Sequence, residues 1–470
     1  MLIIRYLNFW LRMVTFAARG GKLFYAWTGA LALVAAFGAF HYYEHVVVGL
    51  SVTNMSDQVS WGIGIANFVY FVGVAASAAL IITPAYVLMR NDIKEVVLLA
   101  QVLAFVAVVL CLLFIVTDMG RPERMWHIMP LLGKLNLPGS LLAWDVVVFN
   151  GYILLNLHIP GYLLWRRYNG IEPSPWAYLP FIFIAMGWAV SLHVVTAFLL
   201  SGLGSRHFWN TAILAPRFLI TTGVSGPALL TFIFYAVRRL TPLKVKDSVF
   251  EYLKAIMRIT LPLNFFLIGC EVFHEFYTGT LGSASAQYLY FGLHGHDQLT
   301  RIIWTAIAMN TVAMIILLNS NTKILTPAHF LACGLSAFGI WVEKGMGLIF
   351  PGFTPTPLGE IVEYFPSLAE VAVNVGVLAV GMLLFTLMAK VTIGIQCGQL
   401  RLPGRESMPT PPVRSGEPEE LESLPPEPKP EPAPEPKPEP TPEPKPEPTP
   451  EPTPEPAPEP TPELKPEPAT

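Results

Sequence analysis

The feature that most constrains this chain is a series of long apolar stretches, each able to cross a lipid bilayer as a helix. A helix rises about 1.5 Å per residue and the hydrocarbon layer is about 30 Å thick, so about 20 apolar residues span it. The sequence has 470 residues, of which 53% are hydrophobic and 13% charged. Its composition and pattern predict an all-α fold, a polytopic integral membrane helix bundle. Ten windows qualify as spans: Leu23–Phe40, Ile63–Leu88, Val96–Val116, Leu141–Leu164, Tyr178–Leu203, Phe218–Val237, Ile256–Tyr277, Ile302–Leu318, Thr326–Phe350 and Ser367–Ile395.

Composition divides the chain into three parts. Residues 1–22 form a basic N-terminal segment, residues 23–400 hold the ten spans, and residues 409–470 repeat proline and glutamate. Beyond residue 409, fifteen glutamates stand against five basic residues. Because proline removes backbone donors and the tail has few apolar residues to bury, we expect it to be a disordered, extended spacer.

Charge predicts which side of the membrane each loop faces. An even number of spans places both termini on one side, and the loops of that side hold most of the lysines and arginines. Positively charged loops stay in the cytoplasm. We therefore expect both termini to be cytoplasmic, in the inner (cytoplasmic) cell membrane. No cleavage signal follows the basic N-terminal residues, so no removable signal peptide is expected.

One outer loop departs from this charge rule. The stretch from Asp118 to Asp145 holds Arg121, Arg124 and Lys134 between two spans. Asp145 lies one turn into its span, and an ionisable group in that position is costly unless it is paired. We predict an ion pair between Asp145 and Arg121, which serves either as a clamp for the loop or as part of a proton relay.

Acids and histidines recur at the outer ends of the spans. Residues three and four positions apart share a helix face, so the strings HYYEH and EVFHEFY each present an acid and histidine surface. Either string alone is also typical of a solvated interfacial belt. A lone histidine inside a span, His193, is more often a hydrogen-bonded core residue than a ligand. Together the embedded ionisable groups gather in the outer half of the bilayer and leave the inner half nearly apolar, which predicts a site open from the outer face.

Residues 60 to 320 resemble a known family. The strings GRPERMW and PGSLLAWD, then SLHVVTAFLLSG, FWNTAILAPRF and SGPALL, are similar in order and spacing to the signatures of the NrfD/PsrC family of polysulfide reductase membrane subunits. Ten spans instead of eight resemble the longer branch of that family. Within it, RHFWNTAILAPRF is most similar to the DsrP-type subunits of the sulfite-reduction-associated DsrMKJOP complex. Asp118 departs from the pattern, because several relatives have histidine there.

The resemblance implies a quinone-linked function as one subunit of an oxidoreductase complex. Such subunits exchange electrons between a membrane quinol, either menaquinol or ubiquinol, and a periplasmic iron–sulfur subunit, with a multihaem cytochrome c in some complexes. Other membrane subunits and the lipid bilayer are further expected partners, and nucleic acid is not. The cysteines are isolated, without a C-x-x-C pair, so we expect no haem or iron–sulfur cluster in this chain. No metal site is expected.

Quinone chemistry needs acid/base groups beside the head group and an apolar slot for its tail. We predict that the head group binds among Glu44, His45, Glu271 and His274. The predicted proton-transfer residues are Asp145, Glu271 and His274. The predicted quinone-binding residues are His41, Glu44, His45, Asp118, Arg121, His193, Arg217, Glu275 and Glu343.

Two other classes of function remain open at this point. A secondary transporter or ion-translocating subunit would have interrupted helices, inverted repeats and a site near the membrane midplane. A b-type cytochrome would need two histidines at similar depth on facing helices, and His193 with His274 is the only plausible pair.

Overall fold

The computed structural model describes residues 2–129, 132–279, 282–320 and 325–402. Over these residues the chain is helical and contains no strand, and ten helical segments are long and apolar enough to cross a membrane. The predicted fold class is confirmed. The spans are α2 (Lys22–Val48), α3 with α4 (Ile63–Ala76 and Ala78–Tyr86), α5 (Asn91–Asp118), α6 (Leu141–Tyr168), α7 (Leu179–Ser201), α8 (Leu214–Leu240), α9 (Asp247–Thr278), α11 (Gln298–Asn319), α12 (Pro327–Trp341) with the turns that follow it, and α14 (Leu368–Gln396).

Two further helices lie outside the spans. Helix α1 (Leu2–Ala18) occupies the basic N-terminal segment, where the sequence predicted no element, and α10 (Ser283–Tyr290) follows α9. The predicted spacer at 409–470 lies outside the described residues.

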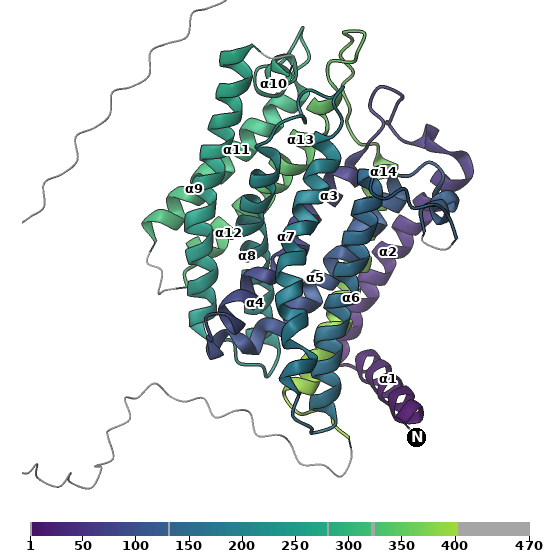
Figure 1. Ribbon diagram of the computed structural model, residues 1–470, viewed down its shortest axis with the longest axis vertical. Helices are drawn as coiled ribbons and strands as arrows, with labels where there is room; N and C mark the ends of the chain where they lie inside the picture. The colour runs from purple at the N-terminus through teal and green to yellow at the C-terminus, as the bar shows by residue number, and fades with distance from the viewer. Residues whose placement is uncertain (1, 130–131, 280–281, 321–324, 403–470) are drawn as a thin grey trace, which may run out of the picture. The chain divides into compact units, whose positions relative to one another are not determined.

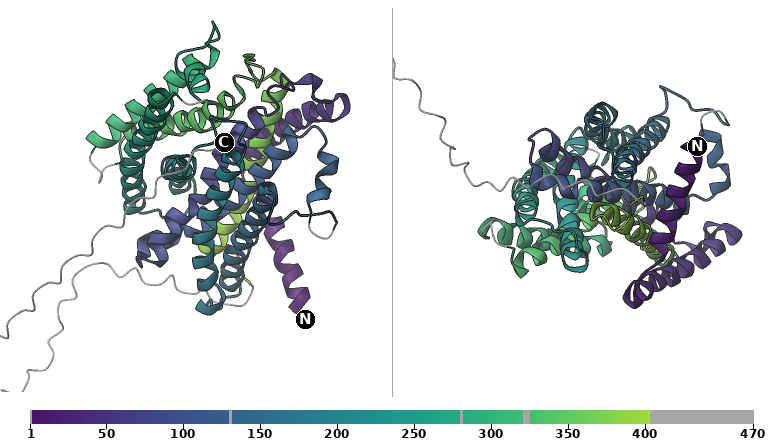
Figure 2. Two further views of the ribbon diagram at one scale, coloured as in Figure 1. Left: turned by 45° about the horizontal axis from the view of Figure 1, so that its top comes forward. Right: turned by 90° about the horizontal axis from the view of Figure 1, so that it is seen from below.

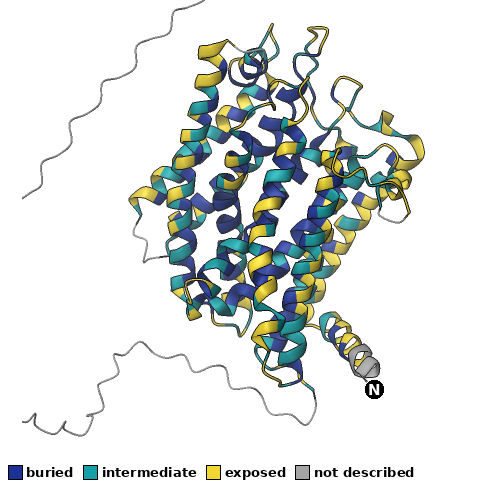
Figure 3. Cartoon of the chain, in the orientation of Figure 1, coloured by how far each residue is buried: buried dark blue, intermediate teal, exposed yellow. Residues whose placement is uncertain are grey.

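The spans are arranged around a buried centre formed by α3, α5 and α8 (Figure 1). Helix α2 lies at one edge and packs mainly on α14, whereas α9 lies at the opposite edge against α8 and α11. Buried residues fill the middle, and exposed residues follow the outer sides of the spans (Figure 3). Large apolar side chains such as Leu33 and Phe266 are exposed there, as expected for surfaces that face lipid.

Two spans are less regular than the sequence predicted. The second span breaks at Ser77, whose hydroxyl donates to the Val74 carbonyl at 2.6 Å. The ninth span passes from α12 through a π turn (Val342–Met346) into the single turn of α13 (Gly347–Ile349). A π turn widens the helix locally and is frequent at functional sites. Here it carries two buried charged residues, Glu343 and Lys344.

The backbones of α2 and α14 touch at a pair of glycines. A Cβ atom built on Gly38 would lie 2.6 Å from the Cα atom of Gly376 and 2.8 Å from the carbonyl oxygen of Ala372. Small residues allow this close approach between membrane helices. The contact brings the C-terminal half of α2 against the N-terminal half of α14.

Replacing Gly38 by alanine should therefore destabilise the protein. The methyl group meets backbone that cannot move aside, and overpacking of this kind costs about 1–3 kcal/mol. Gly29→Ala on the same helix is the matched control, because its Cβ meets no atom within 4 Å. Thermal unfolding of the purified protein measures both variants, and an equal Tm for the two would contradict the crossing.

Candidate functional site

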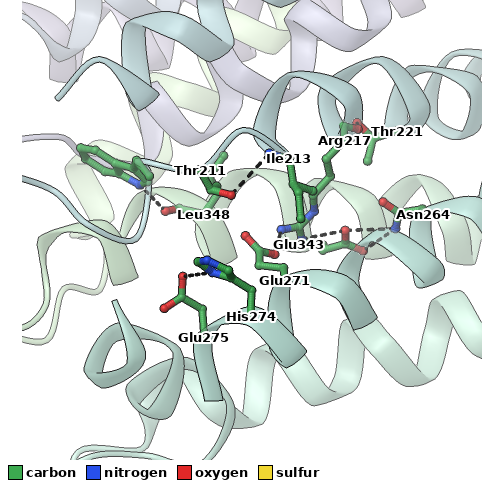
Figure 4. A network of polar contacts seen from close by, with 11 residues as sticks. Thr211, Ile213, Arg217, Thr221, Asn264, Glu271, His274, Glu275, Glu343 and Leu348 are labelled. Carbon is green, nitrogen blue, oxygen red and sulfur yellow. Dashed lines mark hydrogen bonds and ion pairs between the residues drawn. The ribbon is translucent and has the colours of Figure 1, made fainter. Parts of the chain in front are cut away.

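The most densely paired polar group in the bundle is centred on Arg217, near the start of α8 (Figure 4). Its Nη1 donates to the Glu271 carboxylate on α9, and its Nη2 donates to Oε1 of Glu343 at 3.0 Å. All three side chains are buried. Because a buried charge is tolerated when it is paired and hydrogen-bonded, the guanidinium ties α8, α9 and the π turn together.

Two amides complete the hydrogen bonds of Glu343. The Nδ2 atom of Asn264 lies 3.0 and 3.1 Å from the two carboxylate oxygens, and the Nδ2 atom of Asn310 lies 3.1 Å from Oε2. Neither asparagine was singled out from the sequence. The available signal was a single amide within an otherwise apolar window, and a buried amide in lipid must find a partner within the protein.

Lys344 places a second cation beside this group. Its Nζ lies 4.3 Å from the centre of the Phe218 ring and makes no hydrogen bond within the described part of the chain. A Cβ on Gly73 would come within 3.2 Å of Nζ, so the glycine leaves room for the ammonium group. Two cations and two carboxylates are thus gathered at the π turn, and their formal charges cancel.

His274, a predicted proton-transfer residue, does not join this group. Glu271 faces the bundle, but 52% of the His274 side chain is exposed and its Nδ1 lies 3.5 Å from Oε1 of the buried Glu275. The three residues therefore divide between an inner and an outer surface of α9. Burial, together with the nearby negative charge of Glu271, raises the pKa of Tyr290 on α10 well above its ordinary value, so this hydroxyl stays protonated.

A second polar group surrounds a small pocket between α2, α5 and α14, at the opposite edge of the bundle. His45 supplies the feature that distinguishes it: the side chain is buried, and its Nε2 has no hydrogen-bond partner among the described residues. Several other buried side-chain atoms also have no hydrogen-bond partner among the described residues. Of the residues that carry such atoms, only His45 lines this pocket. The lining residues are His41, His45, Val52, Thr53, Met55, Thr117, Asp118, Ala369, Glu370, Val373 and Asn374.

The two carboxylates of the pocket, Asp118 and Glu370, differ in the number of hydrogen bonds that they accept. Asp118 Oδ2 accepts a hydrogen bond from the Gly62 amide at 3.2 Å. Glu370 is more fully bonded: Oε1 accepts from the Tyr364 hydroxyl at 2.5 Å, and Oε2 accepts from the amides of Asn54 and Ser367 at 2.9 and 2.8 Å. Burial and the Glu370 carboxylate raise the pKa of Tyr364 far above its ordinary value, so it stays a donor. Glu370 therefore holds the pocket wall in place.

The predicted pair between Asp145 and Arg121 is wrong. Asp145 is buried in α6 and accepts a hydrogen bond from the Thr196 hydroxyl at 3.3 Å, whereas the exposed Arg121 pairs with Glu123 at 3.4 Å. The loop residues turn toward water, where a guanidinium is well solvated. A neutral threonine on α7 therefore takes the place of the expected cation.

The predicted head-group site is also wrong as one constellation. It joined His45 of α2 to Glu271 of α9, and these helices lie at opposite edges of the bundle (Figure 1). The HYYEH string itself is well placed, because His45 and His41 line the pocket. Glu44 pairs with His41 Nδ1 at 2.9 Å, is half-buried, and is not among the residues that line the pocket.

His193 is a core histidine, as the simpler interpretation of the sequence expected. Its Nε2 lies 2.5 Å from the Thr222 hydroxyl, and its Nδ1 lies 3.3 Å from the Ala189 carbonyl oxygen. With both ring nitrogens engaged and His274 half exposed on α9, the two histidines do not form the pair that a b-type haem would need.

The half of the bundle that we expected to be nearly apolar also contains buried polar residues. Lys254 and His329 are buried near the start of α12, and the Nε2 atom of His329 lies 3.8 Å from the Cys333 sulfur. Among the described residues, no group of three or more His, Cys, Asp or Glu side chains is arranged to hold a metal ion.

Comparison with known proteins decides the family. A family model described as "Polysulphide reductase, NrfD" matches residues 51–355. The chain belongs to the NrfD family. The family's match confirms the resemblance noted in the sequence and leaves α2 and α14 outside its limits. The pocket therefore combines Asp118, from the family region, with His45 and Glu370 from the two flanking helices.

Three relatives cover most of the chain. It is 22% identical to a selenate reductase subunit of Mesobacillus selenatarsenatis, over 76% of this chain and 91% of the relative. It is 25% identical to a putative dimethyl sulfoxide reductase membrane subunit of Halobacterium salinarum, over 77% and 90%. It is also 25% identical to the Hdr-like menaquinol oxidoreductase integral membrane subunit of Archaeoglobus fulgidus, over 77% and 91%. With ten apolar helices and membership of the NrfD family, the chain is a multi-pass integral membrane protein.

Arg217 should be the most stability-critical charged residue. Replacing it by methionine leaves Glu271 and Glu343 buried without their cation, and breaking a buried pair in this way costs about 3–5 kcal/mol. Arg121→Met is the matched control, because an exposed ion pair is worth about 0–1 kcal/mol. Unfolding in detergent compares the variants. A Tm for Arg217→Met equal to that of the control would show that the triad does not hold the bundle together.

Proposed function

We propose that this NrfD-family chain is the quinone-interacting membrane subunit of a redox complex, and that the quinone head group binds in the pocket of α2, α5 and α14. The observation that carries the proposal is the unpartnered Nε2 of His45, which lines the pocket near Asp118. A buried imidazole nitrogen without a partner costs free energy, which a head-group oxygen at that position would recover.

The pocket residues can perform the proton chemistry of quinol oxidation, in which two protons leave with two electrons. His45 Nε2 accepts a hydrogen bond from one quinol hydroxyl, and Asp118 is the nearby carboxylate able to take up a proton. Val52, Met55 and Val373 supply apolar lining. Because α2 is the least buried span, the isoprenoid tail can enter from the lipid beside it.

The finer parts of the function rest on resemblance and charge. The basic inner loops support an inner-membrane protein with both termini cytoplasmic, which places the pocket on the outer side. Exposed Arg121, Arg124 and Lys134 on the outer loop offer a docking surface for a periplasmic iron–sulfur subunit, with multihaem cytochrome c as a further acceptor. The name of the Archaeoglobus relative favours menaquinol, and the RHFWNTAILAPRF string favours a DsrP-type role in sulfur metabolism.

Proton translocation coupled to this electron transfer is a second proposed function. The ion-translocating alternative called for interrupted helices, inverted repeats and a site near the membrane midplane. The π turn interrupts the ninth span, and it carries the buried Glu343 and the unpartnered Lys344. Proton uptake, measured in vesicles while the assembled complex oxidises quinol, tests the proposed translocation.

Substitution of the pocket residues His45 and Asp118 should impair quinol-linked electron transfer. We expect Asp118→Asn to lower kcat by about 10²-fold or more, because a proton acceptor typically contributes that much, and His45→Leu chiefly to raise KM for quinol. The assay is quinol oxidation by the assembled complex in vesicles. Glu123→Gln, an exposed carboxylate of the outer loop, is the control. Turnover at the wild-type level in both pocket variants, with assembly intact, would remove the head group from this pocket.

A further inference from the structure

Helix α1 has three distinct faces, and the first of them packs on the bundle. Phe9 and Met13 are 6% and 4% exposed, and they form a small apolar cluster with Tyr168 and Ile395. The Phe9 ring lies 4.9 Å from that of Trp165 in an edge-to-face arrangement. This face fastens α1 to the ends of α6 and α14.

The second face is apolar and exposed. Trp10, Leu11 and Val14 are 50%, 65% and 63% exposed. At about 100° per residue they lie together on the side of α1 next to the bundle-packing face. These three large side chains form one contiguous apolar patch. Such a patch marks a surface that contacts lipid or another protein.

The third face carries arginine at a constant spacing that continues past the end of the helix. Arg5 and Arg12 stand seven residues apart in α1, which is close to two helical turns or about 10 Å. Arg19 follows at the same spacing, directly after Ala18, the last residue of the helix, and both Arg12 and Arg19 are exposed. Asn8 and Thr15 lie between them. We call Arg5, Arg12 and Arg19 the arginine stripe.

The end of α1 is held in place from α14. Lys390 Nζ donates to the carbonyl oxygen of Ala17 at 3.2 Å and to that of Arg19, and it lies 3.7 Å from the centre of the Phe24 ring. In the view from below, α1 is seen from its side, whereas most of the spans are seen end-on (Figure 2). The helix thus runs across the bundle axis at the end where α2 begins.

We propose that α1 is an in-plane membrane helix that binds anionic phospholipid through the arginine stripe. A helix with an apolar face and a basic face lies in the interface, with its apolar side among the acyl chains. Trp10 and Leu11 would enter that layer, and the stripe would reach the phosphates. Guanidinium groups bind phosphate through paired hydrogen bonds. An anionic headgroup is favoured over a zwitterionic one because the latter carries a cation of its own, which offsets the attraction to the arginines.

The alternative occupant of the same surface is an acidic protein partner. Lipid fits better because one helix carries both an exposed apolar face and an arginine face on separate sides, at the end of a bundle whose outer sides already face lipid. The proposal does not depend on the quinone pocket, which lies near the opposite ends of α2 and α14.

Lipid titration of the delipidated, full-length protein tests the proposal. Native mass spectrometry measures binding of phosphatidylglycerol and of phosphatidylcholine. The wild type should prefer phosphatidylglycerol. The double variant R12Q/R19Q should bind it about 25-fold more weakly, fivefold for each guanidinium, the factor that corresponds to about 1 kcal/mol per charge. Phosphatidylcholine binding should not change.

Two further variants keep the result interpretable. R12K/R19K retains the charge and should keep most of the preference. K244Q/K246Q removes two cations from the loop between α8 and α9, and it should bind phosphatidylglycerol like the wild type. Unchanged binding in R12Q/R19Q, an equal loss in K244Q/K246Q, or no preference in the wild type would each overturn the proposal. So would loss of a partner protein from the purified complex with lipid binding intact, since that assigns the stripe to a protein contact.

Discussion

Every polar group inside this bundle must find its partner within the protein, because the hydrocarbon layer offers neither water nor counter-ions. Arg217 satisfies that requirement for the largest group, since one guanidinium binds Glu271 and Glu343 from two other spans. The amides of Asn264 and Asn310 complete the bonds of Glu343. The positions of α8, α9 and the ninth span follow from these contacts as much as from apolar packing.

The same requirement separates the structural group from the candidate site. The carboxylates of the Arg217 group are paired within the protein, whereas the unpartnered atoms beside them, Nζ of Lys344 and Oδ1 of Asn264 and Asn310, do not line the pocket. At the other edge, His45 presents a buried nitrogen without a partner to a pocket, and Glu370, already fully bonded, fixes the wall beside it. Helices α2 and α14 lie outside the NrfD-family match, and their glycine crossing at Gly38 and Gly376 brings His45 and Glu370 against Asp118.

The spans were predictable from the sequence because hydropathy over about 20 residues depends only on local composition. Depth and helix face were also readable from the sequence. Asp118, Arg217 and Glu343 were therefore recognised as embedded polar residues, and His45 as a candidate ligand at the end of a span. The position of each helix around the bundle was not readable, and the predicted pairing of His45 with Glu271 failed for that reason. The predicted ion pair of Asp145 failed for another reason. Closeness in the sequence favoured Arg121, but the hydrogen-bond partner of Asp145 is Thr196 on the next helix. The pairs around Glu343 join residues 79 and 33 positions apart, which no local pattern indicates.

Photoaffinity labelling with an azido-quinone tests the central claim most directly. The complex is illuminated with the labelled quinone, with and without excess unlabelled quinone, and the modified peptides are identified by mass spectrometry. The account predicts competable labelling of the outer end of α2 around His45, the end of α5 at Asp118 and the start of α14. Competable labelling confined to α8 and α9 around Arg217 and Glu271, with α2 and α14 unmodified, would contradict it.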